Sequence, residues 1–169
     1  TVFINDIDPA SAEAAAKSLR ESGLKAEASP FDVTDHAAGA AAIDRIVAAH
    51  GKLDILMNNA GILIRKPVET HEMTDWDRVI AINLSSYFAL SRTATVHMKK
   101  AGYGRIINTA SLMGISSRPG VASYVAAKHG IIGLARTAAL EAATRGTTVN
   151  ALCPSAVRTP LVEAQLEDL

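Results

Sequence analysis

Short apolar segments alternate with alanine-rich segments along the chain, and this alternation constrains the fold more than any other feature. Segments with the β-branched composition of strands lie at residues 1–5, 24–33, 53–61, 104–111 and 147–160, the last continuing into a loop. Segments with the composition of helices lie at residues 8–23, 34–51, 74–102 and 123–145. Apolar strands that alternate with helices predict a parallel sheet covered on both faces. We therefore expect one α/β domain over residues 1–169, with a three-layer, doubly wound parallel sheet.

Composition excludes several classes of function. Seventeen basic and seventeen acidic residues cancel, and 49% of the residues are hydrophobic. Without a basic stripe or a long apolar run, neither nucleic acid nor a membrane is an expected partner. The single cysteine, Cys153, excludes a disulfide framework and fits a cytoplasmic protein, and the first residues do not have the pattern of a signal peptide. The histidines lack the spacing of metal ligands, so we expect no metal site; they are His36, His50, His71, His97 and His129.

The first predicted strand runs into Asn5 and Asp6, and parallel sheets bind ligands at the carboxyl ends of their strands. A carboxylate at such a place accepts hydrogen bonds from the ribose hydroxyls of a dinucleotide and repels a 2′-phosphate. No Lys or Arg lies within ten residues of Asp6, so the sequence predicts NAD rather than NADP. Alternatively, Asp6 or Asp8 only caps the next helix, for which Asp8 followed by Pro9 is a favourable pair.

Two further strand ends carry polar or small residues. The second strand ends at Asp32 and Val33, where a carboxylate accepts a hydrogen bond from an adenine amino group or simply forms a turn. The third strand, which we expect to be short and buried, ends in Asn58-Asn59-Ala60-Gly61. Small residues let a flat ligand approach the backbone, and amide side chains tie neighbouring strand ends together. A plain turn is the alternative.

Tyr124 and Lys128 lie four residues apart in a predicted helix, so their side chains share one face. Ser111 follows a strand and precedes Tyr124 by thirteen residues. The helix over residues 74–102 contains Asn83 and begins with Thr74 and Asp77 at capping-box spacing. Taken singly, a Tyr–Lys pair occurs by chance in many helices, and an Asn fits a helix bend.

Together these residues resemble a known family. Asn59, Ala60, Gly61, Asn83, Ser111, Tyr124 and Lys128 recur in this order and at similar spacing in short-chain dehydrogenases/reductases. The resemblance covers essentially the whole chain and implies a Rossmann-like dinucleotide-binding domain. In the family, a strand with a Gly-rich phosphate loop precedes a strand like residues 1–5, and a lid and a final strand follow, so we expect a domain incomplete at both ends. Without that central strand, the sheet is expected to be split, with exposed apolar edges.

The resemblance implies hydride transfer between a secondary alcohol and a nicotinamide cofactor, with Tyr124 as the acid/base. A phenol has an unperturbed pKa of about 10, and we expect Lys128 to lower it by roughly three units. Ser111 is expected to hold the substrate oxygen. Lys128 is also expected to bind the nicotinamide ribose, and Asn83 to support a proton path through water.

The resemblance also implies a set of contacts to the cofactor NAD. The residues concerned are Asp6, Asp32, Val33, Asn59, Ala60, Gly61, Tyr124, Lys128, Val157 and Thr159. Val157 and Thr159 are expected to contact the carboxamide of the nicotinamide. Ser155 stands where the family usually has a glycine, and serine tolerates a positive φ poorly, so the geometry of this loop departs from the family pattern.

Within the family, the segments at residues 124–134 and 159–165 are most similar to 3-hydroxybutyrate dehydrogenases, which place a substrate-contacting glutamine at the position of Gln165. Those enzymes surround the substrate carboxylate with polar groups at positions that here hold Leu63, Met113 and Val121. Three apolar side chains cannot pair a buried carboxylate, so we predict a less polar alcohol or ketone. Alternatively, the three residues pack the loop, and a lid supplies the charges.

The helices at residues 75–101 and 123–145 carry more apolar and small residues than one buried face needs. In the family, these helices pair between subunits, so we expect a homodimer or homotetramer. Two other functions also fit the sequence. One is an NADP-dependent 3-oxoacyl-thioester reductase, which Asp6 disfavours. The other is a non-catalytic dinucleotide-binding relic, which the presence of Ser111, Tyr124 and Lys128 disfavours and the expected lack of the Gly-rich phosphate loop favours.

Overall fold

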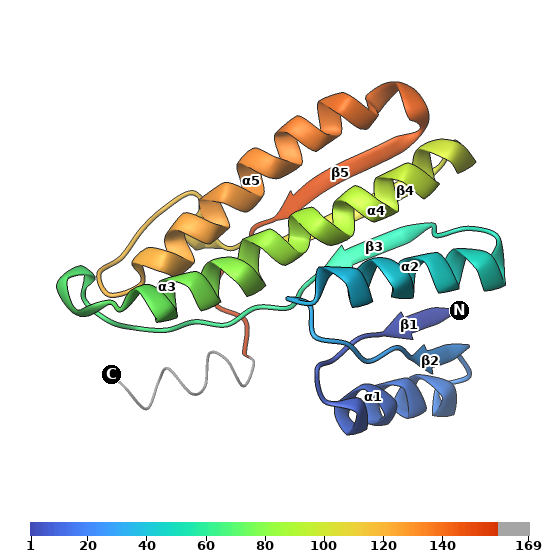
Figure 1. Ribbon diagram of the computed structural model, residues 1–169, viewed down its shortest axis with the longest axis horizontal. Helices are drawn as coiled ribbons and strands as arrows, with labels where there is room; N and C mark the ends of the chain where they lie inside the picture. Colours follow the sequence, from blue (N-terminus) through green and yellow to red (C-terminus); the bar gives the residue numbers. More distant parts are fainter. Residues whose placement is uncertain (159–169) are drawn as a thin grey trace.

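The computed structural model describes residues 1–158, in which strands and helices alternate (Figure 1). The strands are β1 (Val2–Ile4), β2 (Ala26–Ala28), β3 (Ile55–Asn58), β4 (Gly104–Thr109) and β5 (Thr147–Leu152). The helices are α1 (Pro9–Glu21), α2 (His36–His50), α3 (Met73–Ile80), α4 (Ser86–Ala101) and α5 (Ala122–Ala142). Short 3-10 helices cover Val68–Thr70, Leu112–Gly114 and Ala143–Arg145, and a π-helical segment, Ala81–Ser85, joins α3 to α4. The predicted order of elements is confirmed.

The described strands form two parallel sheets, so the expected split is observed. β1 pairs with β2, with Val2 beside Ala26, while β3, β4 and β5 form the second sheet, with Asn58 beside Asn108. β1 and β3 are therefore edge strands. All the strand arrows in Figure 1 point the same way, so the carboxyl ends of both sheets face one side of the molecule.

β3 is not buried, contrary to the prediction from the sequence. Ile55 and Met57 on one of its faces are 56% and 54% exposed, whereas Asn58 on the other face is only 3% exposed. Leu152 on β5 is also exposed. Among the described residues, helices therefore cover one face of the three-stranded sheet, and alternate side chains of its strands meet water.

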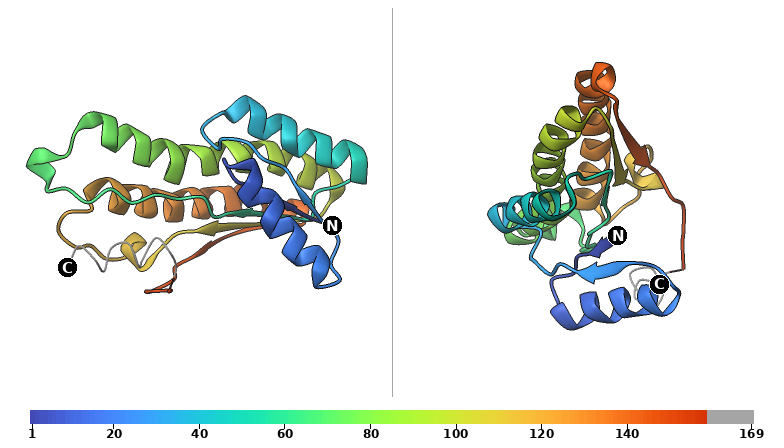
Figure 2. Two further views of the ribbon diagram at one scale, coloured as in Figure 1. Left: turned by 90° about the horizontal axis from the view of Figure 1, so that it is seen from below. Right: turned by 90° about the vertical axis from the view of Figure 1, so that its right-hand side faces the viewer.

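Helices α2, α4 and α5 lie on one side of the sheets, and α1 lies on the opposite side of β1 and β2 (Figure 2). The main core fills the space between these three helices and the three-stranded sheet. Its buried members are Ile43, Leu90, Ala94, Met98, Ile106, Ala135 and Val149. Removing these side chains from water is the main favourable contribution to folding. The predicted α/β, Rossmann-like class is confirmed by this arrangement.

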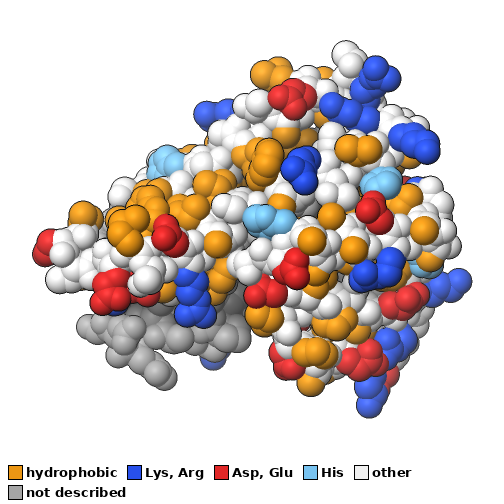
Figure 3. Space-filling model, viewed as in Figure 1, with side chains coloured by type: hydrophobic (Ala, Val, Ile, Leu, Met, Phe, Trp, Pro, Cys, Tyr) orange, Lys and Arg blue, Asp and Glu red, His pale blue; other side chains and the backbone are white. Residues whose placement is uncertain are grey.

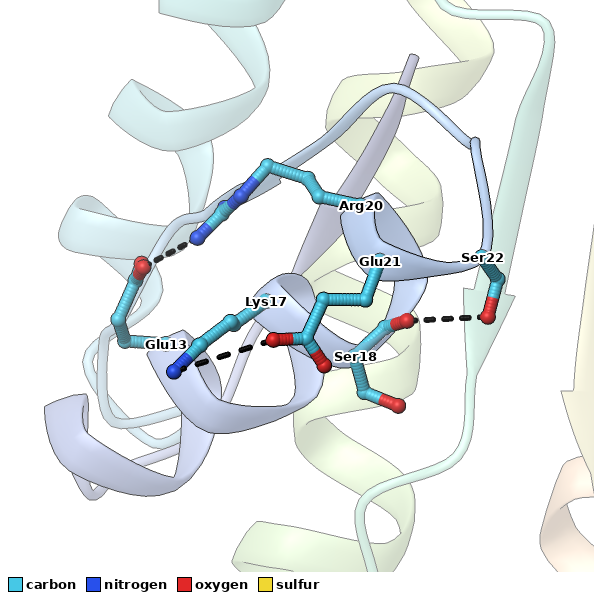
Figure 4. A network of polar contacts seen from close by, with 6 residues as sticks. All are labelled: Glu13, Lys17, Ser18, Arg20, Glu21 and Ser22. Atoms are coloured by element: carbon cyan, nitrogen blue, oxygen red, sulfur yellow. Dashed lines mark hydrogen bonds and ion pairs between the residues drawn. The ribbon is translucent and has the colours of Figure 1, made fainter.

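Helix α1 begins as the sequence predicts. The Asp8 carboxylate accepts hydrogen bonds from the backbone N–H groups of Ala10 (3.1 Å) and Ser11 (3.2 Å), and Pro9 is the first helical residue. The exposed face carries ion pairs between Glu13 and Arg20 and between Lys17 and Glu21 (Figure 4). Exposed ion pairs of this kind contribute little to stability, roughly 0–1 kcal/mol each.

The predicted helix over residues 74–102 is three segments that follow one another: α3, the π-helical segment and α4. It begins at Met73, with Glu72 as the N-cap residue, so the predicted capping box of Thr74 and Asp77 is wrong. Thr74 already lies inside the first turn, where its hydroxyl cannot cap the helix. The wider π turn contains Asn83, in a kind of segment that is found frequently at functional sites.

The visible surface in Figure 3 mixes both signs of charge, with hydrophobic side chains gathered toward the left-hand end of the view. None of the helices in the described part of the chain combines the length and the apolar character that a membrane crossing requires.

Candidate active site

Tyr124 and Lys128 both lie in the first turns of α5, one turn apart, as predicted. The Lys128 side chain is buried, and its ammonium donates a 2.7 Å hydrogen bond to the backbone oxygen of Thr109, the last residue of β4. Its Nζ atom lies 5.4 Å from the centre of the Tyr124 ring. Burial lowers the pKa of Lys128 to about 8, because the site disfavours the charged form. The site therefore holds its lysine near the middle of its titration at mildly alkaline pH.

Ser111 follows β4 and begins the 3-10 helix Leu112–Gly114. Its hydroxyl oxygen accepts a 3.2 Å hydrogen bond from the backbone N–H of Met113. A hydrogen bond between the Ser111 hydroxyl and Tyr124 lowers the pKa of the phenol. The Ser111 hydroxyl thus accepts from the backbone and can direct its own proton toward the Tyr124 oxygen.

The pKa of Tyr124 differs from the prediction. Burial raises the pKa of the phenol above its usual value, and this outweighs the lowering by the Ser111 hydrogen bond and by the positive charge of Arg118. Lys128 was expected to lower this pKa strongly, but its ammonium lies over the ring and donates to Thr109 rather than to the phenol oxygen. In this arrangement Tyr124 is a protonated, uncharged phenol at neutral pH.

Asn83 is fully buried in the π-helical segment and clamps the loop after β3. Its amide oxygen accepts from the backbone N–H of Ile62 (2.8 Å), and its amide nitrogen donates to the Ile62 carbonyl (2.7 Å). A Cβ atom at Gly61 would lie 3.3 Å from the Asn83 Oδ1 atom and 3.8 Å from the Lys128 Nζ atom. Gly61, Asn83 and Lys128 therefore come together, and Gly61 leaves space beside the ammonium.

Amide side chains tie the ends of β3 and β4, as predicted for this turn. The Asn58 amide nitrogen donates to Asn108 Oδ1 (2.8 Å) and to the Ser91 hydroxyl (3.1 Å). The Thr109 hydroxyl donates to Asn59 Oδ1 (3.1 Å). Asn108 and Ser91 were missed by the sequence reasoning, because only the strand register and the packing of α4 bring them to Asn58.

Tyr87 is a second residue that the sequence reasoning missed. It is buried in α4, and its hydroxyl donates to the backbone oxygens of Ala60 (3.0 Å) and Thr109 (3.4 Å). Its ring centre lies 5.4 Å from Lys128 Nζ. Burial raises the pKa of Tyr87 far above its usual value, so it stays a neutral hydrogen-bond donor. An aromatic residue on a helix is usually a core residue, so nothing in the sequence pattern distinguishes Tyr87 as part of the site.

The residues expected to contact the adenosine part of the nucleotide lie in the loops that follow the strands of the smaller sheet. Asp6 is exposed, and one carboxylate oxygen accepts from the backbone N–H of Asp8 (2.9 Å). Asp32 accepts from the backbone N–H and the hydroxyl of Thr34 (2.8 Å each), which lowers its pKa. Asp32 thus forms the turn that was its alternative interpretation. Val33, beside it, is half-buried.

A residue near these carboxylates was also missed. The Asn5 amide nitrogen donates to the backbone oxygens of Ser29 (3.1 Å) and Phe31 (2.9 Å), and so joins the end of β1 to the segment after β2. Asp6 and Asp32 follow the strands of the two-stranded sheet, whereas Tyr124 belongs to α5, which packs on β5 of the three-stranded sheet. The carboxyl ends of both sheets face one side of the molecule (Figure 1).

The residues predicted to contact the substrate differ in how deeply they are buried. Leu63 and Met113 are partly buried, whereas Val121 is 1% exposed and precedes α5. The backbone around Val121 pairs with the loop after β3, because the Lys66 N–H donates to the Gly120 carbonyl (2.9 Å). Val157 is exposed, and Thr159 and Gln165 lie outside the described residues.

Within residues 1–158, no three His, Cys, Asp or Glu side chains are grouped so that they could hold a metal ion.

Known proteins share both the sequence and the fold. The D-beta-hydroxybutyrate dehydrogenase of Rhizobium meliloti is 48% identical over 139 residues, which are 82% of this chain and 54% of that protein. The cyclopentanol dehydrogenase of Comamonas testosteroni is 34% identical over 167 residues, or 99% of this chain and 67% of that protein. The predicted similarity to 3-hydroxybutyrate dehydrogenases is confirmed. The chain spans about two-thirds or less of the length of these relatives.

Solved structures extend the likeness to the whole described fold. A gluconate 5-dehydrogenase from Burkholderia cenocepacia, in complex with NADP and tartrate, superposes with a TM-score of 0.93 at 36% identity, over 98% of this chain and 65% of that one. An NAD⁺-bound xylitol dehydrogenase gives 0.93 at 35% identity, over 98% and 64%. A family model described as short chain dehydrogenase matches residues 1–169. This chain therefore belongs to the short chain dehydrogenase family.

Proposed function

We propose that the protein is an NAD-dependent oxidoreductase that interconverts a small secondary alcohol and the corresponding ketone. One observation carries this proposal: the Tyr124 phenol is hydrogen-bonded to Ser111 and lies one helical turn from the buried ammonium of Lys128. A phenol, a hydroxyl and an ammonium held together can bind an alcohol oxygen and exchange its proton. A lysine that only stabilised the fold through an ion pair would need a carboxylate partner, not a phenol and a hydroxyl.

The residues present fit a nicotinamide cofactor. Gly61 leaves open the space beside Lys128 and Asn83, into which any side chain at that position would intrude. The Lys128 ammonium would hold the nicotinamide ribose, and Asn59, Ala60 and Gly61 would line the approach. On the nucleotide side, Asp6 would accept from the adenosine ribose, with Asp32 and Val33 beside the adenine. Val157 and Thr159 would contact the carboxamide. When bound, the nicotinamide supplies the hydride acceptor or donor.

Within this site, the chain's own residues handle the proton and the substrate oxygen. Ser111 would hold the substrate oxygen with its hydroxyl, whose orientation the Met113 N–H helps to set. Tyr124 would take the alcohol proton as a phenolate and return it as a phenol. Burial raises the Tyr124 pKa, so alcohol oxidation is expected to speed up as the pH rises, while ketone reduction needs the protonated phenol. Asn83 uses its amide on Ile62, so its support of a proton path would come through holding this loop in place.

Preference for NAD is supported by the exposed carboxylate of Asp6, whose charge would repel a 2′-phosphate. Among the relatives, the gluconate 5-dehydrogenase structure contains NADP and the xylitol dehydrogenase structure contains NAD⁺, so both cofactors occur among close neighbours. A preference for NADP would favour the 3-oxoacyl-thioester reductase instead.

The substrate class follows from the apolar side chains next to the site. Leu63 and Met113 are partly buried, and Met113 directly contacts Ser111 through its N–H. Apolar walls favour a substrate without a charge near its reacting carbon. We therefore propose a neutral secondary alcohol, such as a cyclic or short-chain alcohol, over 3-hydroxybutyrate.

The proposal is tested by following NADH formation with cyclopentanol and with 3-hydroxybutyrate, each with NAD and with NADP. We expect turnover with cyclopentanol and NAD, and a loss of about a hundredfold or more in Tyr124→Phe, with NAD binding retained. Tyr103→Phe is the matched control, because Tyr103 is exposed and stacks on Arg105 at the opposite end of β4. Efficient turnover of 3-hydroxybutyrate would overturn the substrate class. Binding of NAD without turnover of any alcohol would indicate a non-catalytic relic.

A homodimer or homotetramer is proposed through the long helices. Phe88, Val96 and Leu140 on α4 and α5 are 53%, 65% and 81% exposed. A groove of about 360 Å³ beside Phe88 is lined by His36, Leu84, Ser85, Phe88, Ala89 and Arg92. Exposed apolar side chains on two neighbouring helices favour association of subunits.

We also propose a cytoplasmic location, which fits the single cysteine.

A further inference from the structure

Tyr87 joins the two strand ends on which the candidate active site is built. Its side chain is 1% exposed, and its hydroxyl lies 3.0 Å from the carbonyl oxygen of Ala60, after β3, and 3.4 Å from that of Thr109, the end of β4. The mechanism proposed above does not use this phenol. A buried hydroxyl whose one proton is shared between backbone carbonyls at the ends of two neighbouring strands restrains their relative position.

The same tyrosine faces the lysine of the site. Lys128 Nζ lies 5.4 Å from the centre of the Tyr87 ring and 5.4 Å from the centre of the Tyr124 ring, so a ring from α4 and a ring from α5 both face one ammonium. The carbonyl to which Lys128 donates, at 2.7 Å, is that of Thr109, which the Tyr87 hydroxyl also reaches. Lys128 and Tyr87 are therefore linked through a ring face and through a shared acceptor.

We propose that Tyr87 is a positioning residue for Lys128: its ring holds the ammonium opposite Tyr124, and its hydroxyl fixes the Thr109 carbonyl that accepts the lysine's hydrogen bond. The placement of Lys128 by Tyr87 does not depend on the reaction. Its consequence for turnover rests on the function proposed above.

The physical reason is the cost of burying a charge. An ammonium 3% exposed has lost nearly all its water, and the negative face of an aromatic ring replaces part of that solvation. The titratable groups that face Lys128 are the two phenols, Tyr87 from α4 and Tyr124 from α5, and Arg118 acts on the Tyr124 phenol in turn. Both phenols are neutral near neutral pH, so they act on the ammonium through their ring faces.

The direct test is the pKa of Lys128, followed by NMR titration of the full chain labelled with ¹³C at the lysine Cε atom, with Lys128→Arg used to assign the signal. Tyr87→Phe keeps the ring but releases the Thr109 carbonyl that binds the ammonium, so it is expected to lower the pKa of Lys128 only slightly. A fluorinated phenylalanine in place of Tyr87 keeps the volume but weakens the negative ring face. It is expected to lower the pKa by roughly 0.5–1 unit relative to Tyr87→Phe.

The matched control is Phe88→Leu, which removes an exposed ring from the next position of α4 and should leave the pKa of Lys128 unchanged. A Lys128 pKa that stays at its wild-type value in the fluorinated variant would overturn the role of the ring. A fall in Tyr87→Phe as large as in the fluorinated variant would also overturn it, because the hydroxyl alone would then account for the effect.

The consequence for turnover is measured in the pH profile of kcat/KM for alcohol oxidation. The rise of oxidation with pH that Tyr124 produces should end where Lys128 loses its charge. This upper limit is expected to move to lower pH by the shift seen in the NMR titration, with kcat falling more than KM rises. A merely structural Tyr87 would lower activity equally at every pH. If the wild type oxidises no alcohol at all, the proposed function fails, while the NMR titration still decides the role of Tyr87.

Discussion

The unit of β1, α1 and β2 and the unit of β3, β4 and β5 use polar side chains in opposite ways. In the first, the polar contacts are exposed: Glu13 pairs with Arg20 on α1, and Asp6 and Asp8 bind backbone N–H groups at the surface. In the second, Asn58 and Asn108 bond to each other below 4% exposure. Exposed pairs contribute roughly 0–1 kcal/mol, whereas a buried polar group left without a partner costs about 1–3 kcal/mol.

The two units should therefore differ in how well they tolerate substitution of their polar side chains. The carboxylates proposed to select the nucleotide belong to the unit where substitutions change little besides local charge. The residues proposed to carry out the chemistry belong to the unit where buried polar groups depend on one another, so their substitution changes stability and activity together. Four predictions test this contrast, beginning with the largest expected effect.

Asn83→Ala should have the largest effect on stability. It removes both hydrogen bonds that hold Ile62 and leaves two partly buried backbone groups without these partners, so the free energy of unfolding should fall by about 3 kcal/mol. Chemical denaturation measures this change. Asn150→Ala is the matched control, because Asn150 is exposed on β5 and its loss should change stability by no more than about 0.5 kcal/mol. Equal effects of the two substitutions would contradict the contrast between buried and exposed polar side chains.

Lys128→Met is expected to stabilise the fold while it removes activity. Burial lowers the Lys128 pKa to about 8, so below that pH the folded state carries a buried charge that the unfolded state keeps in water. Removing it should raise the free energy of unfolding at pH 7 by about 2 kcal/mol, since the Thr109 carbonyl loses its donor and offsets part of the gain.

The pH dependence gives the sign of this effect. Above about pH 8 and below the unfolded-state pKa of about 10.4, the unfolded state binds more protons at Lys128, so wild-type stability should rise with pH in that window. The rise should be absent in Lys128→Met and present in Lys100→Met, which removes an exposed lysine of α4. Denaturation at a series of pH values from neutral to mildly alkaline checks both. A loss of stability at pH 7 in Lys128→Met would count against a destabilising buried charge.

Asp6→Ala should change the choice of cofactor without changing stability much. The preference for NAD over NADP, measured as the ratio of kcat/KM values, should fall about tenfold, because one repulsive charge near the 2′-phosphate is lost. Asp8→Asn is the control: it removes a neighbouring charge while the amide oxygen keeps the helix cap. An unchanged ratio in Asp6→Ala would show that the ribose contact lies elsewhere.

Glu13→Gln should have the smallest effect. The Glu13–Arg20 pair is exposed, and Arg20 also donates to the Ala26 carbonyl (3.0 Å), so α1 stays attached to β2 without the ion pair. We expect a change in the free energy of unfolding of about 0.5 kcal/mol or less, by thermal or chemical denaturation. A loss comparable to that of Asn83→Ala would remove the distinction between the two units.

The features that the sequence predicted correctly are local or repeated. The Asp8 cap depends on residues within three positions of it, and the strand–helix alternation repeats along the whole chain. The meeting of Ser111 with Tyr124 could be predicted only from the resemblance to a family, since thirteen residues and a loop separate them.

The features that the sequence did not predict arise from tertiary contacts. Asn83 bonds to Ile62, twenty-one residues away, and Tyr87 reaches carbonyls at the ends of two strands. The exposure of Ile55 and Met57 depends on which strands and helices pack against β3, and the composition of the strand does not predict this. The Tyr124 pKa was predicted from distance alone, whereas burial and the direction of the Lys128 side chain decide it.

The π-helical segment Ala81–Ser85 has a consequence for the phase of the long helix that contains it. A wider turn inserts an extra residue into the helical repeat, so the side chains before and after it are rotated relative to a continuous α-helix. α3 can thus direct its buried face toward α5, while α4 directs its own toward α2. Deleting a single residue from this segment would restore an uninterrupted α-helix, but with one of the two faces turned by about 100° away from its partner.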